Sequence, residues 1–191
     1  VTVRGTTYRH PDGVLYLTQF TQVAMACLAV AQVAELREDG LFIDGSYFAG
    51  HSVGEYTALA AISGTLSLES LLEIVFKRGL AMHTLVPRDA EGNSNYRLAA
   101  IRPSQMGVAD ADVADWVARV SEESGEFLQI VNYNLAGSQY AIAGTVAGCE
   151  ALESAVTTAV ERHGGKAAFV LVPGIDVPFH SQVLRDGVPE F

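Results

Sequence analysis

The stretch Gly50-His51-Ser52-Val53-Gly54 is the feature that most restricts how this chain can fold. It stands between a short apolar run at 47–49 and an alanine-rich stretch, so it predicts a sharp turn from a strand into a helix, with Ser52 at the apex. A side chain at such an apex is held in a strained backbone, and small residues two positions to either side let the two segments approach closely. The pattern therefore predicts that the turn requires both Gly50 and Gly54.

The helix after this turn is expected to direct its free amide groups and the positive end of its dipole at Ser52. The N–H of Val53 is the favoured donor to an oxyanion at this position. Gly-x-Ser-x-Gly is only moderately specific, and a turn with a solvent-facing serine has the same pattern. The predicted context, a strand before and a helix after, favours an activated serine.

Composition limits the classes of protein to which the chain can belong. With 191 residues, 49% of them apolar and 18% charged, the sequence predicts one packed domain, or one core with a smaller insertion. The net charge of −10 and the scattered Lys and Arg make nucleic acid and anionic membranes poor partners. No apolar run is expected to span a membrane, and we expect a cytoplasmic protein.

Two cysteines, Cys27 and Cys149, lie in helix-like segments without metal-type spacing, and both are expected to be small buried hydrophobic residues. No metal or redox cofactor is expected, because metal-ligand and dinucleotide motifs are missing. The chain has no initiating methionine and ends abruptly at 190–191. These ends indicate a piece of a longer protein.

The first part of the chain is predicted to be helical around the turn. A turn at 11–13 closes a polar entry loop, and a long helix is expected over 17–38, with Thr18 as its N-cap and Gly40 at its end. Gln19 and Gln22 fall in its first turn and are interpreted as surface or cap groups. A second helix is expected to run to Ile62.

Ser67 is predicted to cap a further helix, which carries Arg78. The spacing from Leu71 and Val75 places Arg78 near the buried edge of that helix. Periodicity alone still favours a solvated Lys77-Arg78 pair.

The pattern changes over 97–172 to the order β-α-β-β-α-β of ferredoxin-like folds. Strands are expected over 97–101, 127–133, 139–143 and 166–172, and helices over 109–123 and 146–163. This predicts a small subdomain at 97–172 inserted into a larger core made of residues 1–96 and 173–191, in an α/β protein.

A serine nucleophile needs a base within hydrogen-bond reach. His180 is the best of five histidines, because two prolines keep the segment 173–181 extended and able to present a side chain to a cleft; the other four are His10, His51, His83 and His163. A buried, satisfied histidine is an equally good interpretation. Either Asp176 or a backbone carbonyl could orient His180, and the order Ser-Asp-His keeps a hydrolase open.

Five ordered motifs together resemble one family. They are Gly50-His51-Ser52-Val53-Gly54-Glu55-Tyr56, Lys77-Arg78-Gly79-Leu80-Ala81-Met82, Asn132-Tyr133-Asn134, Gln139-Tyr140-Ala141-Ile142-Ala143-Gly144 and Val177-Pro178-Phe179-His180-Ser181. They resemble the malonyl-CoA:acyl-carrier-protein transacylase family, and most of all the malonyl/palmitoyl transferase domain of type I fatty acid synthases of the fungal and actinobacterial kind. The likeness runs from Thr18 to the end of the chain.

The resemblance implies an α/β-hydrolase-like core with an inserted ferredoxin-like subdomain. It implies that Ser52 takes an acyl group from coenzyme A as an ester, and that His180 activates Ser52. The acyl group then passes to a carrier-protein phosphopantetheine thiol in a ping-pong cycle. The matching arginine of the family binds the malonyl carboxylate as a bidentate pair, which replaces the solvated interpretation of Arg78.

Further substrate contacts follow from the resemblance alone. Phe179 and Val53 look like malonyl-type residues, since a bulky ring leaves no room for a methyl branch at the acyl α-carbon. Met82 and Asn134 are also implied to bind substrate. No permanently bound cofactor is implied; the partners are malonyl-CoA or another acyl-CoA, an acyl carrier protein and other fatty acid synthase domains.

The family pattern also has parts that this sequence lacks. A Gly-Gln-Gly loop upstream and a polar residue after the histidine are not found, so the resemblance implies an incomplete domain. Two alternatives stay open: a serine hydrolase or thioesterase that uses Ser52, His180 and Asp176, and a non-catalytic structural segment of a megasynthase.

Overall fold

The computed structural model describes residues 1–10 and 12–189, which divide into two compact units, residues 1–84 and 85–189. The predicted division into a core at 1–96 and 173–191 and a subdomain at 97–172 remains a prediction. Residue 11 of the expected turn at 11–13 and residues 190–191 of the expected core lie outside the described residues.

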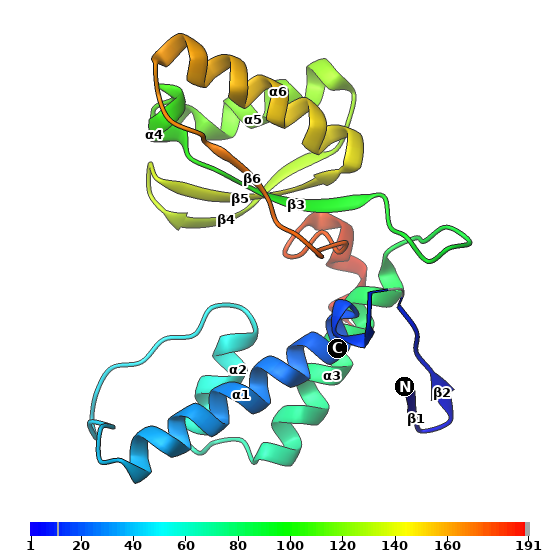
Figure 1. The fold of residues 1–191 in the computed structure, drawn as a ribbon, viewed down its shortest axis with the longest axis vertical. Helices are drawn as coiled ribbons and strands as arrows, with labels where there is room; N and C mark the ends of the chain where they lie inside the picture. Colours follow the sequence, from blue (N-terminus) through cyan, green and yellow to red (C-terminus); the bar gives the residue numbers. More distant parts are fainter. Residues whose placement is uncertain (11, 190–191) are drawn as a thin grey trace. The chain divides into compact units, whose positions relative to one another are not determined.

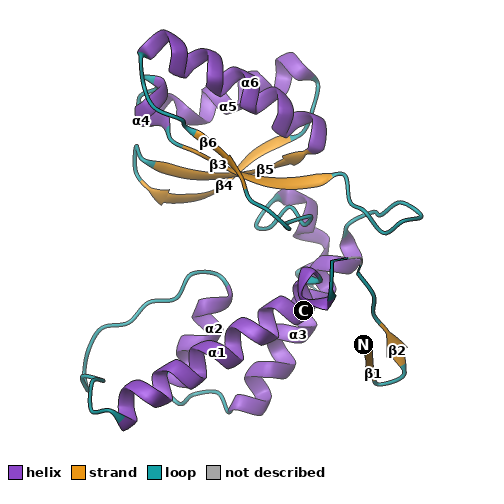
Figure 2. Ribbon diagram, viewed as in Figure 1, coloured by secondary structure: helices purple, strands orange, loops and turns teal. Residues whose placement is uncertain are grey.

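The first unit is mainly helical (Figures 1 and 2). An antiparallel ribbon of two short strands and a 3-10 turn precede three α-helices, the last of which ends one residue into the second unit. In chain order these are β1 (Thr2–Val3), β2 (Thr6–Thr7), η1 (Val14–Tyr16), α1 (Thr18–Glu38), α2 (Val53–Ala61) and α3 (Leu68–Leu85).

Helix α1 confirms the expected long helix and its end at Gly40, which has a φ of 68° and donates its N–H to the carbonyl of Arg37. The expected cap is wrong. Leu17 is the N-cap residue, without a side-chain cap bond, and Thr18 is already helical. The Thr18 hydroxyl instead accepts a hydrogen bond from Nε2 of Gln22 at 3.0 Å, because the first turn faces the interior of the unit.

Helix α1 also corrects the expectation that no apolar run could span a membrane. By length and composition alone, it is the one helix among the described residues that could do so. The core helix of a water-soluble protein passes the same test, and α1 buries the polar side chains of Thr18, Gln19 and Gln22 at its N-terminal end.

A small apolar core holds α1, α2 and α3 together. It contains Ala26 of α1, Val53 of α2, and Leu71 and Val75 of α3, all buried. The predicted cap of α3 is confirmed, since the Ser67 hydroxyl accepts a hydrogen bond from the amide of Ser70 at 3.1 Å.

Helices α1 and α3 approach closely where Gly79 faces Gln19. A Cβ on Gly79 would lie 2.4 Å from the Cα of Gln19 and 2.7 Å from its nitrogen. Only a residue without a side chain fits at this crossing. Gly79 therefore determines the point along each helix at which α1 and α3 cross.

The second unit has the predicted β-α-β-β-α-β order, with a short helix and two 3-10 turns added (Figure 1). Its elements are β3 (Tyr96–Ile101), α4 (Pro103–Met106), η2 (Asp110–Asp112), α5 (Val113–Ser124), β4 (Leu128–Leu135), β5 (Gln139–Thr145), α6 (Val146–His163), β6 (Phe169–Leu171) and η3 (Gln182–Gly187). The sheet order is β4-β5-β3-β6, with every neighbouring pair antiparallel. This is the ferredoxin-like arrangement that the sequence predicts.

Successive side chains of a strand point to opposite faces of the sheet, and those on one face form the core of this unit. Ile101, Tyr140 and Ile142 face α5 and α6, which lie on one face of the sheet (Figure 2), and pack there with Leu152 and Val156. The expected burial of Cys149 is confirmed, and burial raises the pKa of its thiol to about 11. The expectation for Cys27 is wrong, because that cysteine is exposed on α1.

Candidate active site

Ser52 occupies the strained position that the turn predicts. Its φ is 56° and its ψ is −115°, a region that residues with a side chain rarely adopt, and it immediately precedes α2. The expected strand before the turn is wrong, since residues 46–51 form no strand and Tyr47 is fully exposed. A strand needs a partner for its ladder of hydrogen bonds. In the described part of this unit, β1 and β2 pair only with each other.

The two glycines of the turn are not equivalent. A Cβ on Gly50 would lie 2.2 Å from the carbonyl carbon of Gly54 and 2.3 Å from the nitrogen of Glu55. A Cβ on Gly54 would meet nothing within 4 Å. The expectation that the turn requires a glycine is therefore confirmed for Gly50 and is wrong for Gly54, because the close approach is of the Gly50 Cα to the first turn of α2.

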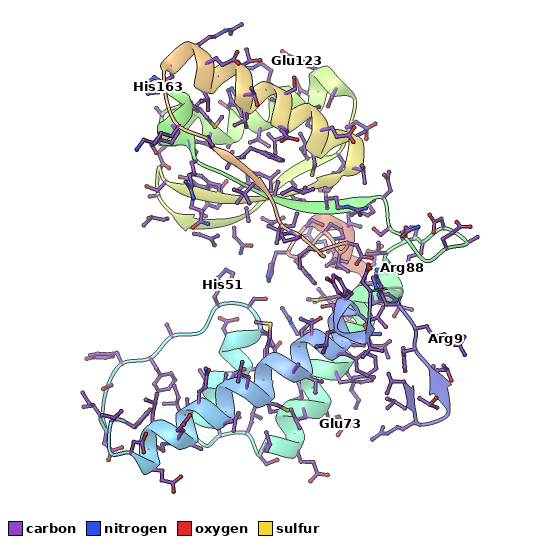
Figure 3. The ribbon with its side chains drawn as sticks, in the orientation of Figure 1. Arg9, His51, Glu73, Arg88, Glu123 and His163 are labelled. Atoms are coloured by element: carbon purple, nitrogen blue, oxygen red, sulfur yellow. The ribbon has the colours of Figure 1, made fainter. Side chains whose placement is uncertain are left out.

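The amide end of α2 adjoins Ser52. The amides of Gly54 and Glu55 donate to the carbonyls of His51 and Ser52, which closes the first turn, and Val53 is the first residue of α2. Figure 3 shows His51 on the loop that leads into α2. The role of the Val53 N–H as an oxyanion donor remains a prediction.

Arg78 of α3 faces the serine. Its Nη2 donates to Oγ of Ser52 at 3.0 Å, and its Nη1 donates to Oε1 of Gln22 at 2.6 Å. Nε2 of Gln22 in turn donates to Oγ1 of Thr18 at 3.0 Å and contacts Sδ of Met82 at 3.8 Å. A connected chain of polar side chains therefore runs from Thr18 and Gln22 of α1 through Arg78 of α3 to the candidate nucleophile.

The charge of Arg78 is partly desolvated. Burial lowers the pKa of its guanidinium, while the nearby Tyr56 and Glu55 act in the opposite direction. The Tyr56 ring centroid lies 5.7 Å from Cζ of Arg78. Among the described residues no carboxylate forms an ion pair with Arg78, and Gln22 and Ser52, two of its hydrogen-bond partners, are neutral. The interpretation of Arg78 as a solvated surface charge is wrong.

Gln22 is the residue that the sequence reasoning missed. The sequence predicts that Gln22 and Gln19 are surface or cap groups, but Gln22 is 5% exposed and Gln19 is 0% exposed. The signal was present in the helical period, because Thr18, Gln22 and the buried Ala26 recur at intervals of four. Neither amide atom of the Gln19 side chain has a hydrogen-bond partner in the described residues.

The remaining predicted site residues belong to the second unit. His180 is exposed in the segment between β6 and η3, and its φ is 60°, a strained value like that of Ser52. Phe179 is half-buried beside it, and Asn134 is exposed on β4. Because His180 and Ser52 lie in different units, their pairing remains a prediction, as do the substrate contacts of Phe179, Asn134 and Met82.

Asp176 is engaged elsewhere. Both of its carboxylate oxygens accept hydrogen bonds from the guanidinium of Arg88. This pairing counts against the hydrolase alternative, in which the carboxylate of Asp176 would orient His180. Across residues 1–10 and 12–189, no group of three or more His, Cys, Asp or Glu side chains is arranged to hold a metal ion.

Curated relatives of this chain are fatty acid synthases. It is 36% identical to "Fatty acid synthase 2" of Mycosarcoma maydis, over 98% of this chain and 6% of the relative. It is 34% identical to "Fatty acid synthase subunit beta" of Saccharomyces cerevisiae, over 97% of this chain and 11% of the relative. The chain thus spans only a small part of the length of these proteins.

Solved structures share the fold. FabD of Acinetobacter baumannii superposes with a TM-score of 0.72 at 28% identity, over 94% of this chain and 51% of that one. A type II polyketide synthase malonyl-transacylase in complex with its acyl carrier protein gives a TM-score of 0.73 at 26% identity, over 98% of this chain and 52% of that one. The predicted α/β fold and its partial extent agree with these neighbours.

The family described as "Acyl transferase domain" matches residues 7–163, which include Ser52, Arg78, Met82 and Asn134 and end before Phe179 and His180. The match covers most of the chain, and the relatives and structural neighbours agree with it. This chain belongs to the acyl transferase domain family.

Proposed function

We propose that this chain carries the acyl-transfer site of a fatty acid synthase, which moves malonyl groups from coenzyme A to the phosphopantetheine thiol of an acyl carrier protein. The observation that carries the proposal is the 3.0 Å hydrogen bond from Nη2 of Arg78 to Oγ of Ser52. It puts a guanidinium that forms no ion pair within the described part of the chain next to a serine in a nucleophile-elbow conformation. An acyl group that bears a free carboxylate matches this arrangement, because guanidinium and carboxylate form bidentate pairs.

In the first half-reaction, Oγ of Ser52 attacks the thioester carbonyl, His180 takes the hydroxyl proton, and the coenzyme A thiolate leaves with that proton. In the second, the carrier-protein thiol attacks the Ser52 ester and returns the proton to Oγ through His180. The amide of Val53 would stabilise both oxyanions. Arg78 exchanges its hydrogen bond to Ser52 for the malonyl carboxylate when substrate binds.

The other binding roles are proposed from the resemblance to the family and from the relatives. Met82, Phe179 and Asn134 would contact the acyl group, and other synthase domains and a carrier protein would be the partners of this chain in the cytoplasm. A structural neighbour that is a malonyl-transacylase in complex with an acyl carrier protein supports the carrier partner. An uncharged acyl group such as palmitoyl would use the same Ser52 ester without the ion pair to Arg78.

Intact mass spectrometry followed by peptide mapping tests the covalent step directly. The native protein that carries these 191 residues is incubated with malonyl-CoA and quenched in acid. The proposal predicts one added malonyl group on the peptide that contains Ser52, none in the Ser52→Ala variant, and loss of the group when a carrier-protein thiol is added. No adduct on Ser52 would contradict the proposal, and an adduct that only water removes would favour the hydrolase.

A further inference from the structure

Arg88 and Asp176 form a partly buried ion pair that the proposed reaction does not use. Nη1 of Arg88 bonds Oδ2 of Asp176, and Nη2 bonds Oδ1 at 3.1 Å, so the pair is bidentate. The side chains are only 14% and 22% exposed. A partly buried bidentate pair fixes the orientation of the two side chains as well as the distance between them, because the planar guanidinium and carboxylate must align.

Arg88 lies in a turn that several hydrogen bonds hold in place. Its Nη1 also donates to the carbonyl of Gly92 at 2.8 Å, and its backbone pairs with Ser94 in an isolated antiparallel bridge. The neighbouring Asp89 accepts the amide of Asn93 at 2.7 Å and its side-chain Nδ2 at 3.1 Å. These bonds restrict the movement of the segment 88–94, and so they fix the position of the guanidinium (Arg88 in Figure 3).

Asp176 lies four residues before His180, in a segment whose backbone is restrained by burial and hydrogen bonds. Val177 and Pro178 between them are both buried, and the amide of Phe179 donates to the carbonyl of Val177 at 2.9 Å. The amide and the hydroxyl of Ser181 both bond the carbonyl of Pro178, at 3.2 and 2.7 Å. A displacement of Asp176 would therefore be transmitted to His180.

The far side of His180 is also held by a side chain. Oε1 of Gln129, on β4, accepts the amide of Gln182 at 2.9 Å. His180 thus lies between two anchors, Arg88–Asp176 and Gln129–Gln182, and keeps a φ of 60°. Such a strained backbone persists only where its surroundings enforce it.

We infer that the Arg88–Asp176 pair is a positioning device for His180, which holds the strained segment 176–181 so that the imidazole is presented in one orientation. The inference rests on the proposed function, in which His180 is the base. Arg88 and Asp176 are positioning residues and do not touch the acyl group. Their contribution is expected in the rate of proton transfer and not in substrate binding.

A double-mutant cycle in the native protein tests the inference. Asp176→Asn keeps the shape of the side chain and removes its charge, and the rate of Ser52 acylation by malonyl-CoA is measured in single turnovers. We expect the rate to fall about 10- to 100-fold, with the KM for malonyl-CoA changed less than about 2-fold. In a His180→Ala background the same change should cost less than about 2-fold, because the group it positions is gone.

Two further variants separate positioning from folding. The swap Arg88→Asp with Asp176→Arg should recover at least about a third of the rate lost in Asp176→Asn, because the bidentate pair is restored with its partners exchanged. Glu73→Gln, which breaks the exposed Glu73–Lys77 pair, serves as the matched control and should leave the rate unchanged. Thermal melting shows that each variant is folded at the assay temperature.

The outcomes separate this inference from the proposed function. An equal loss from Asp176→Asn with and without His180, a raised KM at unchanged rate, or no loss would each overturn the inference while His180 keeps its role. Full activity of His180→Ala would instead overturn the proposed role of His180, and the inference with it.

Discussion

Oε1 of Gln22 accepts a hydrogen bond from Nη1 of Arg78 at 2.6 Å, so an amide on α1 holds the guanidinium on α3 that faces Ser52. The amide is itself fixed by Thr18 one turn back along α1. A neutral acceptor aligns the arginine without neutralising it. This leaves the charge of Arg78 available to an incoming carboxylate.

The first prediction changes that acceptor into an anion. Gln22→Glu places a carboxylate beside Arg78, where it forms the ion pair that the malonyl group would otherwise form. We expect kcat/KM for malonyl-CoA to fall about 100-fold, and that for an uncharged acyl-CoA to change less than about 3-fold. Steady-state rates with the two substrates measure the difference.

The matched control for Gln22→Glu lies on the same helix. Gln32→Glu adds the same charge at an exposed position of α1 and should change neither rate. Equal losses with both substrates in Gln22→Glu would contradict the assignment of Gln22 to Arg78.

The second prediction concerns the two glycines of the turn. Gly50→Ala places a methyl group about 2.2 Å from the backbone of Gly54, which backbone atoms can relieve only by opening the turn, and it should destabilise the fold by about 3 kcal/mol or more. Gly54→Ala meets open space in α2 and should stabilise the fold by about 0.5–1 kcal/mol. Thermal or urea unfolding of the two variants measures the contrast, and similar shifts in both would show that the turn is built differently.

Some of the site was within reach of the sequence, and the reasons are local. The apex position of Ser52 follows from the Gly-x-Ser-x-Gly pattern and the helix after it, and the requirement for Gly50 follows from the approach of the chain to the first turn of α2. The four-strand subdomain follows from alternation in strands and helical periods between them, which its core of Ile101, Tyr140 and Ile142 realises.

Other features depend on contacts between segments distant in the sequence. Thr18 and Gln22 looked like end-of-helix polar groups, and only the packing of α1 on α3 turns them inward. The run at 47–49 has the composition of a strand, but no described segment pairs with it. The Arg88–Asp176 pair joins residues 88 positions apart, which no periodicity reveals.

The third prediction uses the two cysteines. Burial raises the pKa of Cys149 to about 11, above its usual range, while Cys27 is exposed. Native protein at pH 8 should therefore expose one fast thiol to a disulfide reagent, and unfolded protein two. A Cys27→Ser variant should show none in the native state, and fast reaction in that variant would contradict the burial of Cys149.

The same thiol gives a pH dependence of stability. Because the folded-state pKa of Cys149 is raised, the folded protein keeps a proton that the unfolded chain loses above about pH 9. The free energy of unfolding should fall between about pH 9 and pH 11 through this group, and should not depend on it below pH 9. Urea titrations of the protein and of Cys149→Ala across this range isolate the contribution, and identical slopes would contradict it.

In the proposed function, Arg78 selects an acyl group with a free carboxylate for transfer through Ser52. The most direct test of this selection is the ratio of kcat/KM for malonyl-CoA to that for an uncharged acyl-CoA, measured in the native protein and in Arg78→Ala. We expect the ratio to fall at least about 100-fold in Arg78→Ala, because only the malonyl reaction loses a charge-assisted pair, and Arg78→Lys to restore part of it. An unchanged ratio, whether both rates fall together or neither falls, would rule out selection by Arg78.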